Sequence, residues 1–135
     1  MSPGSTRLVA VITIATAAAV GLGSRIRPFV ETPVLGTHVG DACWTIAVCG
    51  VLRLLRPEDP TARLACLGWA LSVAVELSQL LQVGWLETIR ANRIGALLIG
   101  RGFLWTDLAA YTVGVLLWAG FDAFVRRRRG STTMG

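Results

Sequence analysis

The residues best able to do chemistry are polar and ionisable side chains that interrupt long apolar stretches. Glu76 stands in VAVELSQLLQV, and Ser72, Glu76 and Gln79 recur at helical spacing, so they share one helix face. Asp107 and Tyr111 are spaced in the same way in a later apolar stretch. Ionisable groups are costly in apolar surroundings and commonly mark a function, so these residues are candidates for a binding or catalytic site.

Three arginines and a further acid belong to the same group of candidates. Asp41 begins one apolar stretch, in GDACW, and Arg25 ends another, in GLGSR. Arg90 and Arg93 are three residues apart in RANR, which places them on neighbouring edges of one helix face. The predicted polar cluster consists of Arg25, Asp41, Glu76, Gln79, Arg90, Arg93, Asp107 and Tyr111.

Three classes of function fit this polar cluster. A binding protein would use the planar guanidinium groups of Arg90 and Arg93 to hold the phosphate or carboxylate of an anionic amphiphile or lipid head group. A structural subunit would use the cluster to hold its helices together for assembly into a membrane complex. A membrane enzyme would use Glu76 or Asp107 as a general acid or base on a lipid-linked substrate. We rank binding first, assembly second and catalysis third.

Each of these residues also has a purely structural explanation. Glu76 paired with an arginine of RANR would lock a helix to the following segment, and Gln79 would hydrogen-bond to a neighbouring helix. Asp41 and Asp107 stand at helix starts, where they would cap free N–H groups and meet the positive end of the helix dipole. Tyr111 would simply pack. One interhelical lock would not need so many charged groups, so the cluster as a whole favours a function.

The sequence contains no motif of a familiar enzyme or metal centre. The single histidine, His38, lies in a predicted loop without neighbouring ligands at metal-binding spacing, so no metal site is expected. Cys43, Cys49 and Cys66 are odd in number and lie in apolar stretches, which argues against a disulfide framework. There is no nucleophile elbow and no phosphate-binding loop. We therefore expect no cofactor.

Four apolar stretches must position the polar cluster, and a bilayer requires about 17–25 helical residues. The stretches cover residues of about 8–23, 40–55, 63–83 and 103–125. The intervening segment 84–102 carries three arginines and a short apolar run, which predicts a short interfacial or re-entrant helix. The expected fold is all-α: a four-helix transmembrane bundle that forms a single integral membrane domain over residues 1–135.

The first stretch is also compatible with a cleavable secretory signal. Arg7, the apolar run and the small residues that end it fit such a signal. Thr13, Ala17 and Gly21, however, recur every four residues. Such a stripe of small residues lets two membrane helices approach closely, which favours retention of the stretch as a helix.

Composition and charge favour a membrane protein. The 135 residues are 53% hydrophobic and 16% charged, whereas soluble proteins average about 25% charged residues. The net charge of +5 comes from arginines that stand between apolar runs, so we expect no nucleic-acid partner. The expected partners are the lipid bilayer and an anionic lipid or amphiphile, and a homo-oligomer is compatible with them.

The distribution of arginines predicts the orientation in the membrane. If the amino terminus is cytoplasmic, eight of the thirteen arginines lie on the inner side and five on the outer side. The positive-inside rule favours this arrangement. We therefore expect a multipass protein of the cell (inner or plasma) membrane, with both termini in the cytoplasm and the polar cluster in the outer half of the membrane.

Four strings of the sequence resemble the bacterial domain of unknown function 2809 family. They are GLGSR, GDACW, VELSQLLQVGWLETIRANRIGALLIGRGF and WTDLAAYTVG. More distantly, Glu76-x-x-Gln79, an arginine of RANR and Asp107 are similar to the VanZ-like membrane proteins, which usually have Asn where Tyr111 stands here. The closer family has no assigned activity, so the resemblance supports the polar cluster as a site and leaves the function open.

Overall fold

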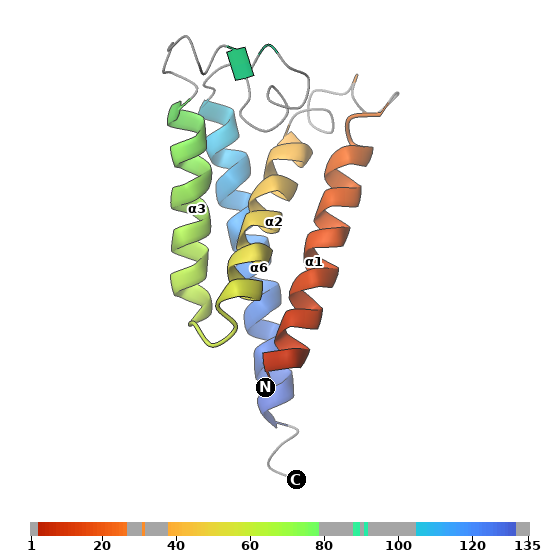
Figure 1. The fold of residues 1–135 in the computed structure, drawn as a ribbon, viewed down its shortest axis with the longest axis vertical. Coiled ribbons are helices and arrows are strands. Elements are labelled where there is room, and N and C mark those ends of the chain that lie inside the picture. Colours follow the sequence, from red (N-terminus) through yellow and green to blue (C-terminus); the bar gives the residue numbers. More distant parts are fainter. Residues whose placement is uncertain are drawn as a thin grey trace.

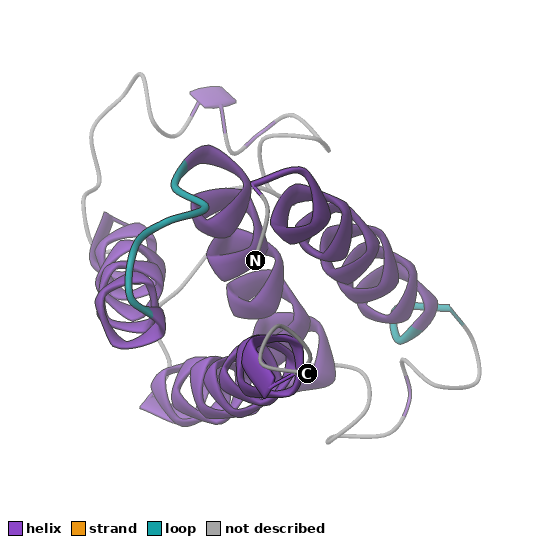
Figure 2. Ribbon diagram, turned by 90° about the horizontal axis from the view of Figure 1, so that it is seen from below, coloured by secondary structure: helices purple, strands orange, loops and turns teal. Residues whose placement is uncertain are grey.

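The protein is all-α in the computed structural model, which describes residues 3–26, 31, 38–78, 88–89, 91 and 105–131. Four long helices run along a common axis (Figure 1), and the described segments contain no strand (Figure 2). The helices are α1 (Pro3–Gly23), α2 (Val39–Leu55), α3 (Thr61–Ser78) and α6 (Trp105–Ser131). The predicted all-α fold with four helices is confirmed.

The helices alternate in direction, so that both chain termini lie at one end of the bundle, the lower end in Figure 1. We call this the terminal end; it also holds the turn between α2 and α3, residues 56–60. At the opposite end, here called the distal end, α1 and α3 finish and α2 and α6 begin. Residues far apart in the sequence therefore meet at each end.

Prolines set the turn between α2 and α3. The helix α2 ends at Leu55, and the backbone N–H of Arg56 donates to the carbonyl of Leu52 at 2.8 Å just before Pro57. The carbonyl of Pro60 accepts the N–H of Leu64 at 3.2 Å, so Pro60 stands at the first turn of α3. Proline is tolerated there because the first N–H groups of a helix have no partner within the helix. The short turn makes α2 and α3 antiparallel neighbours.

The core lies between α2, α3 and α6. Its buried members are Cys49, Leu64, Ala65, Val115 and Trp118.

One glycine lets α2 and α6 approach most closely. A Cβ atom added to Gly114 would lie 2.5 Å from the carbonyl oxygen of Ala42 and 3.0 Å from its Cα. Because these are backbone atoms of α2, a larger residue would force the two helices apart. This approach determines how near the starts of α2 and α6 lie to each other.

The small residues of α1 pack against α2 in part as predicted. Ala17 is buried, and a Cβ on Gly21 would lie 3.1 Å from the Cβ of Cys43. The hydroxyl of Thr13 instead donates to the carbonyl of Val9 within α1, at 2.8 Å. Two of the three residues in the predicted stripe therefore serve close packing.

The outward faces of the helices are apolar, as a lipid environment requires. Large exposed side chains on α1 and α6 include Leu8, Leu22, Leu116, Leu117 and Phe124. Among the described helices, α1, α3 and α6 are long and apolar enough to cross a membrane. The helix α2 has 17 residues, at the lower end of the range that spans a bilayer. The chain is a membrane protein.

The helices differ from the predicted stretches mainly at their ends. The helix α1 begins at Pro3, and α6 continues to Ser131, so that the arginine run 126–129 is helical. Arginine is a good helix former, and nothing in the run interrupts the helix. The predicted interfacial segment 84–102 lies outside the described residues except for 88, 89 and 91, and so do residues 79–83.

Candidate functional site

Five members of the predicted polar cluster lie at the distal end of the bundle. Arg25 follows α1, Asp41 is in the first turn of α2, and Glu76 is near the end of α3. Asp107 and Tyr111 are in the first two turns of α6. The remaining predicted members lie outside the described residues; these are Gln79, Arg90 and Arg93.

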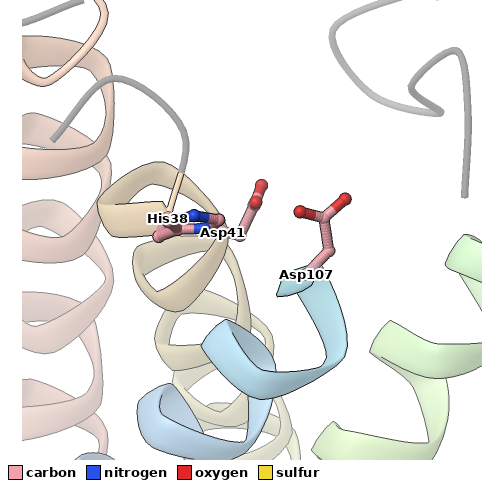
Figure 3. A group of neighbouring side chains, drawn as sticks. All are labelled: His38, Asp41 and Asp107. Carbon is pink, nitrogen blue, oxygen red and sulfur yellow. The ribbon is translucent and has the colours of Figure 1, made fainter. Parts of the chain in front are cut away.

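Asp41 and Asp107 approach each other across the gap between α2 and α6, and His38 joins them (Figure 3). His38 immediately precedes α2 and Asp41 follows one turn later. One ligand atom from each of the three side chains lies within 4.8 Å of the others. The sequence placed His38 in a loop without neighbouring ligands, and that expectation is wrong. Two carboxylates and an imidazole form a compact set of donor atoms.

Among the described residues, one carboxylate oxygen of Asp107 has no hydrogen-bond partner. The residue is 8% exposed, and its Oδ1 atom is buried without a hydrogen-bond partner. The Nδ1 atom of His38 is also buried, and it has no hydrogen-bond partner among the described residues. Buried polar atoms are nearly always hydrogen-bonded, so each exception needs an explanation. The predicted role of Asp107 as a helix cap does not account for its Oδ1 atom.

The carboxyl groups of Asp41 and Asp107 face each other at the starts of α2 and α6, with one oxygen of each within 4.8 Å of the other (Figure 3). Two carboxylates repel each other at such a distance unless a proton or another cation lies between them. Each acid stands in the first turn of its helix, where the helix dipole favours a negative charge. The dipoles explain why acids are tolerated here, but not why two of them face each other.

Glu76 and Tyr111 form a second polar pair, deeper between α3 and α6. The Tyr111 hydroxyl donates to Oε2 of Glu76 at 2.7 Å. Glu76 is fully buried and Tyr111 is 5% exposed. Tyr111 is one partner of Glu76; the arginines of RANR, which the sequence analysis considered as partners, lie outside the described residues. Tyr111 therefore has a hydrogen-bonding role rather than a packing role alone.

The face shared by Ser72 and Glu76 continues the polar path into the bundle. Ser72 is 1% exposed and donates to the carbonyl of Gly68 at 2.9 Å. Its hydroxyl also accepts a hydrogen bond of 3.2 Å from Thr45 on α2. The helical spacing of Ser72 and Glu76 thus predicted an inward face correctly. The polar path ends at Thr45 and Ser72, above the apolar core.

Arg25 is the arginine that the structure describes at the distal end. Its guanidinium group lies against Gly40, where an added Cβ would be 3.5 Å from both Nε and one terminal nitrogen. Ser24, next to Arg25, is buried and donates to the carbonyl of Gly21 at 2.8 Å. Gly40 precedes Asp41, so Arg25 lies close to the acidic group without entering the bundle.

Apolar grooves run from this site along the outside of the bundle. The groove between α2 and α6 has a volume of about 520 Å³, with His38 and Thr106 at one end and Ala42, Val113 and Leu117 along its walls. A second groove, between α1, α2 and α6, has a volume of about 480 Å³. The two share Cys43, Ile46 and Leu117. The two grooves are therefore adjacent, and the groove between α2 and α6 reaches the polar group at His38.

Sequence reasoning missed a buried ion pair at the terminal end. Arg53 donates to both carboxylate oxygens of Asp122, at 3.0 and 2.6 Å, and the Thr61 hydroxyl donates to Asp122 at 2.5 Å. In the sequence analysis, Arg53 counted only as one of the eight arginines expected on the inner side, and no partner was named for Arg53 or Asp122. Each stands alone in an apolar run, in GVLRLL and FDAFV, and this was the signal that they pair across helices.

The sequence also contains a spacing that could have identified His38 as a neighbour of Asp41. His38 and Asp41 are three residues apart at a helix start, a spacing that places two side chains on neighbouring positions of one helix. His38 and Asp41 lie close to Asp107 because α2 packs against α6. The spacing of residues along the chain does not predict that packing.

A family model described as "Protein of unknown function (DUF2809)" matches residues 30–115. The matched region contains His38, Asp41, Glu76, Asp107 and Tyr111, and it leaves out α1 with Arg25 and the second half of α6 with Asp122. No solved structure matches the chain.

Proposed function

The chain belongs to the DUF2809 family of proteins of unknown function, and we propose that this membrane protein binds an anionic amphiphile at its distal end. The observation that carries the proposal is the position of His38, which belongs both to the polar group with Asp41 and Asp107 and to the end of the apolar groove between α2 and α6. An amphiphile needs this combination, because its head group is polar and its tail is apolar.

The groove between α2 and α6 provides a place for the apolar tail. Its volume of about 520 Å³ falls within the range of about 300–1,000 Å³ that is usual for small-molecule sites. Val113 and Leu117 on its wall are more than half exposed, and Ile46 continues it towards the core. A hydrocarbon chain in the groove would contact α2 and α6 along about two helical turns.

We infer a negative charge on the head group from the arginines of the predicted polar cluster. Asp41, Glu76 and Asp107 would repel an anion, and Arg25 is the described cation beside them. The proposal therefore assigns the anion to Arg90 and Arg93, whose planar guanidinium groups form paired hydrogen bonds with phosphate or carboxylate. The acids would orient these arginines.

We further propose that the chain crosses the cell membrane four times, with both termini in the cytoplasm. The alternating helices and the common position of the termini in Figure 1 support an even number of crossings. The arginine run 126–129 at the terminal end supports a cytoplasmic location for that end. A reporter fused after Arg129 is expected to be active only in its cytoplasmic form, and an external signal would overturn the orientation.

Native mass spectrometry of the full chain, purified in detergent, tests the amphiphile. The wild-type protein is expected to retain an anionic lipid, and Arg90→Lys and Arg93→Lys are expected to retain less of it. Lysine keeps the charge but loses the paired hydrogen bonds of the guanidinium group. The matched control is Arg63→Lys at the terminal end, where the Arg63 side chain is 64% exposed and pairs loosely with Asp59 at 3.7 Å.

Two results would contradict the proposal. In the first, the wild-type protein retains no anionic lipid. In the second, the distal variants and the Arg63→Lys control retain the same lipids to the same extent, as generic attraction to head groups would give.

A structural role in assembly is the second candidate, and the shape of the grooves favours it independently. The two adjacent grooves along α2, between α1 and α6, are apolar and open, so another membrane helix would also fit them. The same spectra separate the two candidates. A lipid-bearing monomer supports amphiphile binding, and a lipid-free dimer or larger assembly supports the assembly role.

A further inference from the structure

We propose that His38, Asp41 and Asp107 form a binding site for a divalent transition-metal cation of the Mn²⁺ and Zn²⁺ class. The inference concerns the protein's own side chains and does not depend on the proposed amphiphile.

The geometry of the three side chains is close to that of a metal site. One ligand atom from each residue lies within 4.8 Å of the other two. Ligand atoms about 2.0–2.2 Å from a shared metal ion in tetrahedral geometry lie about 3.4 Å apart, so the three side chains would move together on binding. Figure 3 shows the carboxyl groups of Asp41 and Asp107 on facing helix starts, with the His38 ring beside Asp41. The helices that carry Asp41 and Asp107 already lie side by side, so the proposal requires movement of the three side chains and not of the helices.

Unsatisfied atoms point to a ligand at this position. Oδ1 of Asp107 and Nδ1 of His38 are buried and have no hydrogen-bond partner among the residues that the structure describes, and Asp107 is 8% exposed. A carboxylate oxygen and an imidazole nitrogen are both metal ligands. A bound cation would satisfy both atoms at once. A proton between the two acids would satisfy the acids but leave Nδ1 of His38 without a partner.

The charges of the group also favour a cation. Two facing carboxylates would balance the charge of one divalent ion, and the fully buried Glu76 adds a third acid from α3. Arg25 lies to one side, against Gly40, where it can pair with the outer part of the group. A divalent cation would therefore remove the repulsion that the packing of α2 against α6 creates.

The donor types narrow the class of metal. Mg²⁺ and Ca²⁺ prefer oxygen ligands alone, whereas a set of one imidazole and two carboxylates suits Mn²⁺, Fe²⁺ or Zn²⁺. Three protein ligands leave at least one coordination position open for water or another oxygen ligand. His38 also lines the groove between α2 and α6, so the open position has access to whatever occupies that groove.

Mn²⁺ is the appropriate probe, because Cys43, Cys49 and Cys66 are free thiols that would compete for Zn²⁺. The full chain is purified in detergent without a polyhistidine tag, treated with EDTA, and titrated with MnCl₂ while the electron paramagnetic resonance signal of free Mn²⁺ is followed. We expect one Mn²⁺ per chain. Asp41→Asn and Asp107→Asn are expected to weaken binding by about tenfold or more, because even outer-shell changes cost about 10–100-fold in metal affinity.

Asp59→Asn at the terminal end is the matched control. The Asp59 carboxylate makes surface pairs with Arg56 and Arg63, at 3.4 and 3.7 Å, and lies at the other end of the bundle. This variant makes the same chemical change and is expected to bind Mn²⁺ like the wild type.

A second measurement does not depend on the variants. His38 is the single histidine of the chain, so ¹⁵N-histidine labelling yields the resonances of one imidazole ring. Bound Mn²⁺ is paramagnetic and is expected to broaden these resonances beyond detection at one equivalent. The proposal is overturned if the wild-type protein leaves Mn²⁺ free at millimolar concentration or if the His38 resonances stay sharp. Equal binding by the wild type and Asp107→Asn would also overturn it.

Discussion

The two ends of the bundle hold buried charges in opposite ways. At the terminal end, Arg53 is 2% exposed and its guanidinium group makes five hydrogen bonds, equal to its full donor capacity. Two of them reach Asp122 and two reach the carbonyls of Pro57 and Asp59. The ring of Trp118 lies 5.8 Å from the same group. This cluster is complete without any other molecule.

At the distal end, the described acids outnumber the described bases. Asp41, Glu76 and Asp107 meet Arg25 and His38, and two buried atoms have no hydrogen-bond partner. The difference indicates that the terminal end stabilises the fold, whereas the described side chains of the distal end leave polar atoms unpaired, as the residues of a binding site do.

The largest expected effect is at the terminal end. Asp122→Asn removes the negative charge that faces Arg53 and leaves a buried cation without its partner. We expect the free energy of unfolding to fall by about 3–5 kcal/mol, as for other buried pairs that lose one member. Equilibrium unfolding of the detergent-solubilised protein measures this. The control is Asp59→Asn at the same end, whose surface pairs predict a loss of about 0–1 kcal/mol. If the two variants lost the same free energy of unfolding, the buried Arg53–Asp122 pair would stabilise the protein no more than the surface pairs of Asp59.

An intermediate effect is expected where α2 and α6 touch. Gly114→Ala places a Cβ against the backbone of Ala42, and overpacking of this kind costs about 1–3 kcal/mol. The variant also moves Asp41 away from Asp107, so it should weaken Mn²⁺ binding although it changes no ligand. Gly120→Ala is the control: nothing lies within 4 Å of its added Cβ, and alanine is the better helix former. The same titrations and unfolding measurements check both variants.

The smallest effect is expected at the distal end, and it has the opposite sign. Asp107→Asn makes the same substitution as Asp122→Asn in the same helix, but here it relieves repulsion from Asp41. In EDTA, we expect it to stabilise the protein by about 0.5–2 kcal/mol, the range typical of single stabilising substitutions. Unfolding in EDTA measures the gain. A clear loss of stability would mean that Asp107 belongs to the fold in the way that Asp122 does.

Much of the architecture could be predicted from the sequence, because it follows from local properties. Long apolar runs must form helices in a membrane, where unpaired backbone groups are costly. Two prolines within the turn at 56–60, Pro57 and Pro60, separate α2 from α3. The spacing of Ser72 and Glu76 predicted their common buried face, and the positions of Asp41 and Asp107 at helix starts placed both at one end. These inferences need only distances along the chain.

The pairing of side chains across helices was decided by tertiary structure alone. Arg53 and Asp122 are 69 residues apart, and each taken singly resembles a charge at a membrane surface. Asp41 meets Asp107, and His38 joins them, because Gly114 admits the backbone of α2 against α6. Tyr111 finds Glu76 through the packing of α6 on α3. Residue types and spacing specify which groups face inward, but the choice of partner depends on how closely the helices pack and how their ends align.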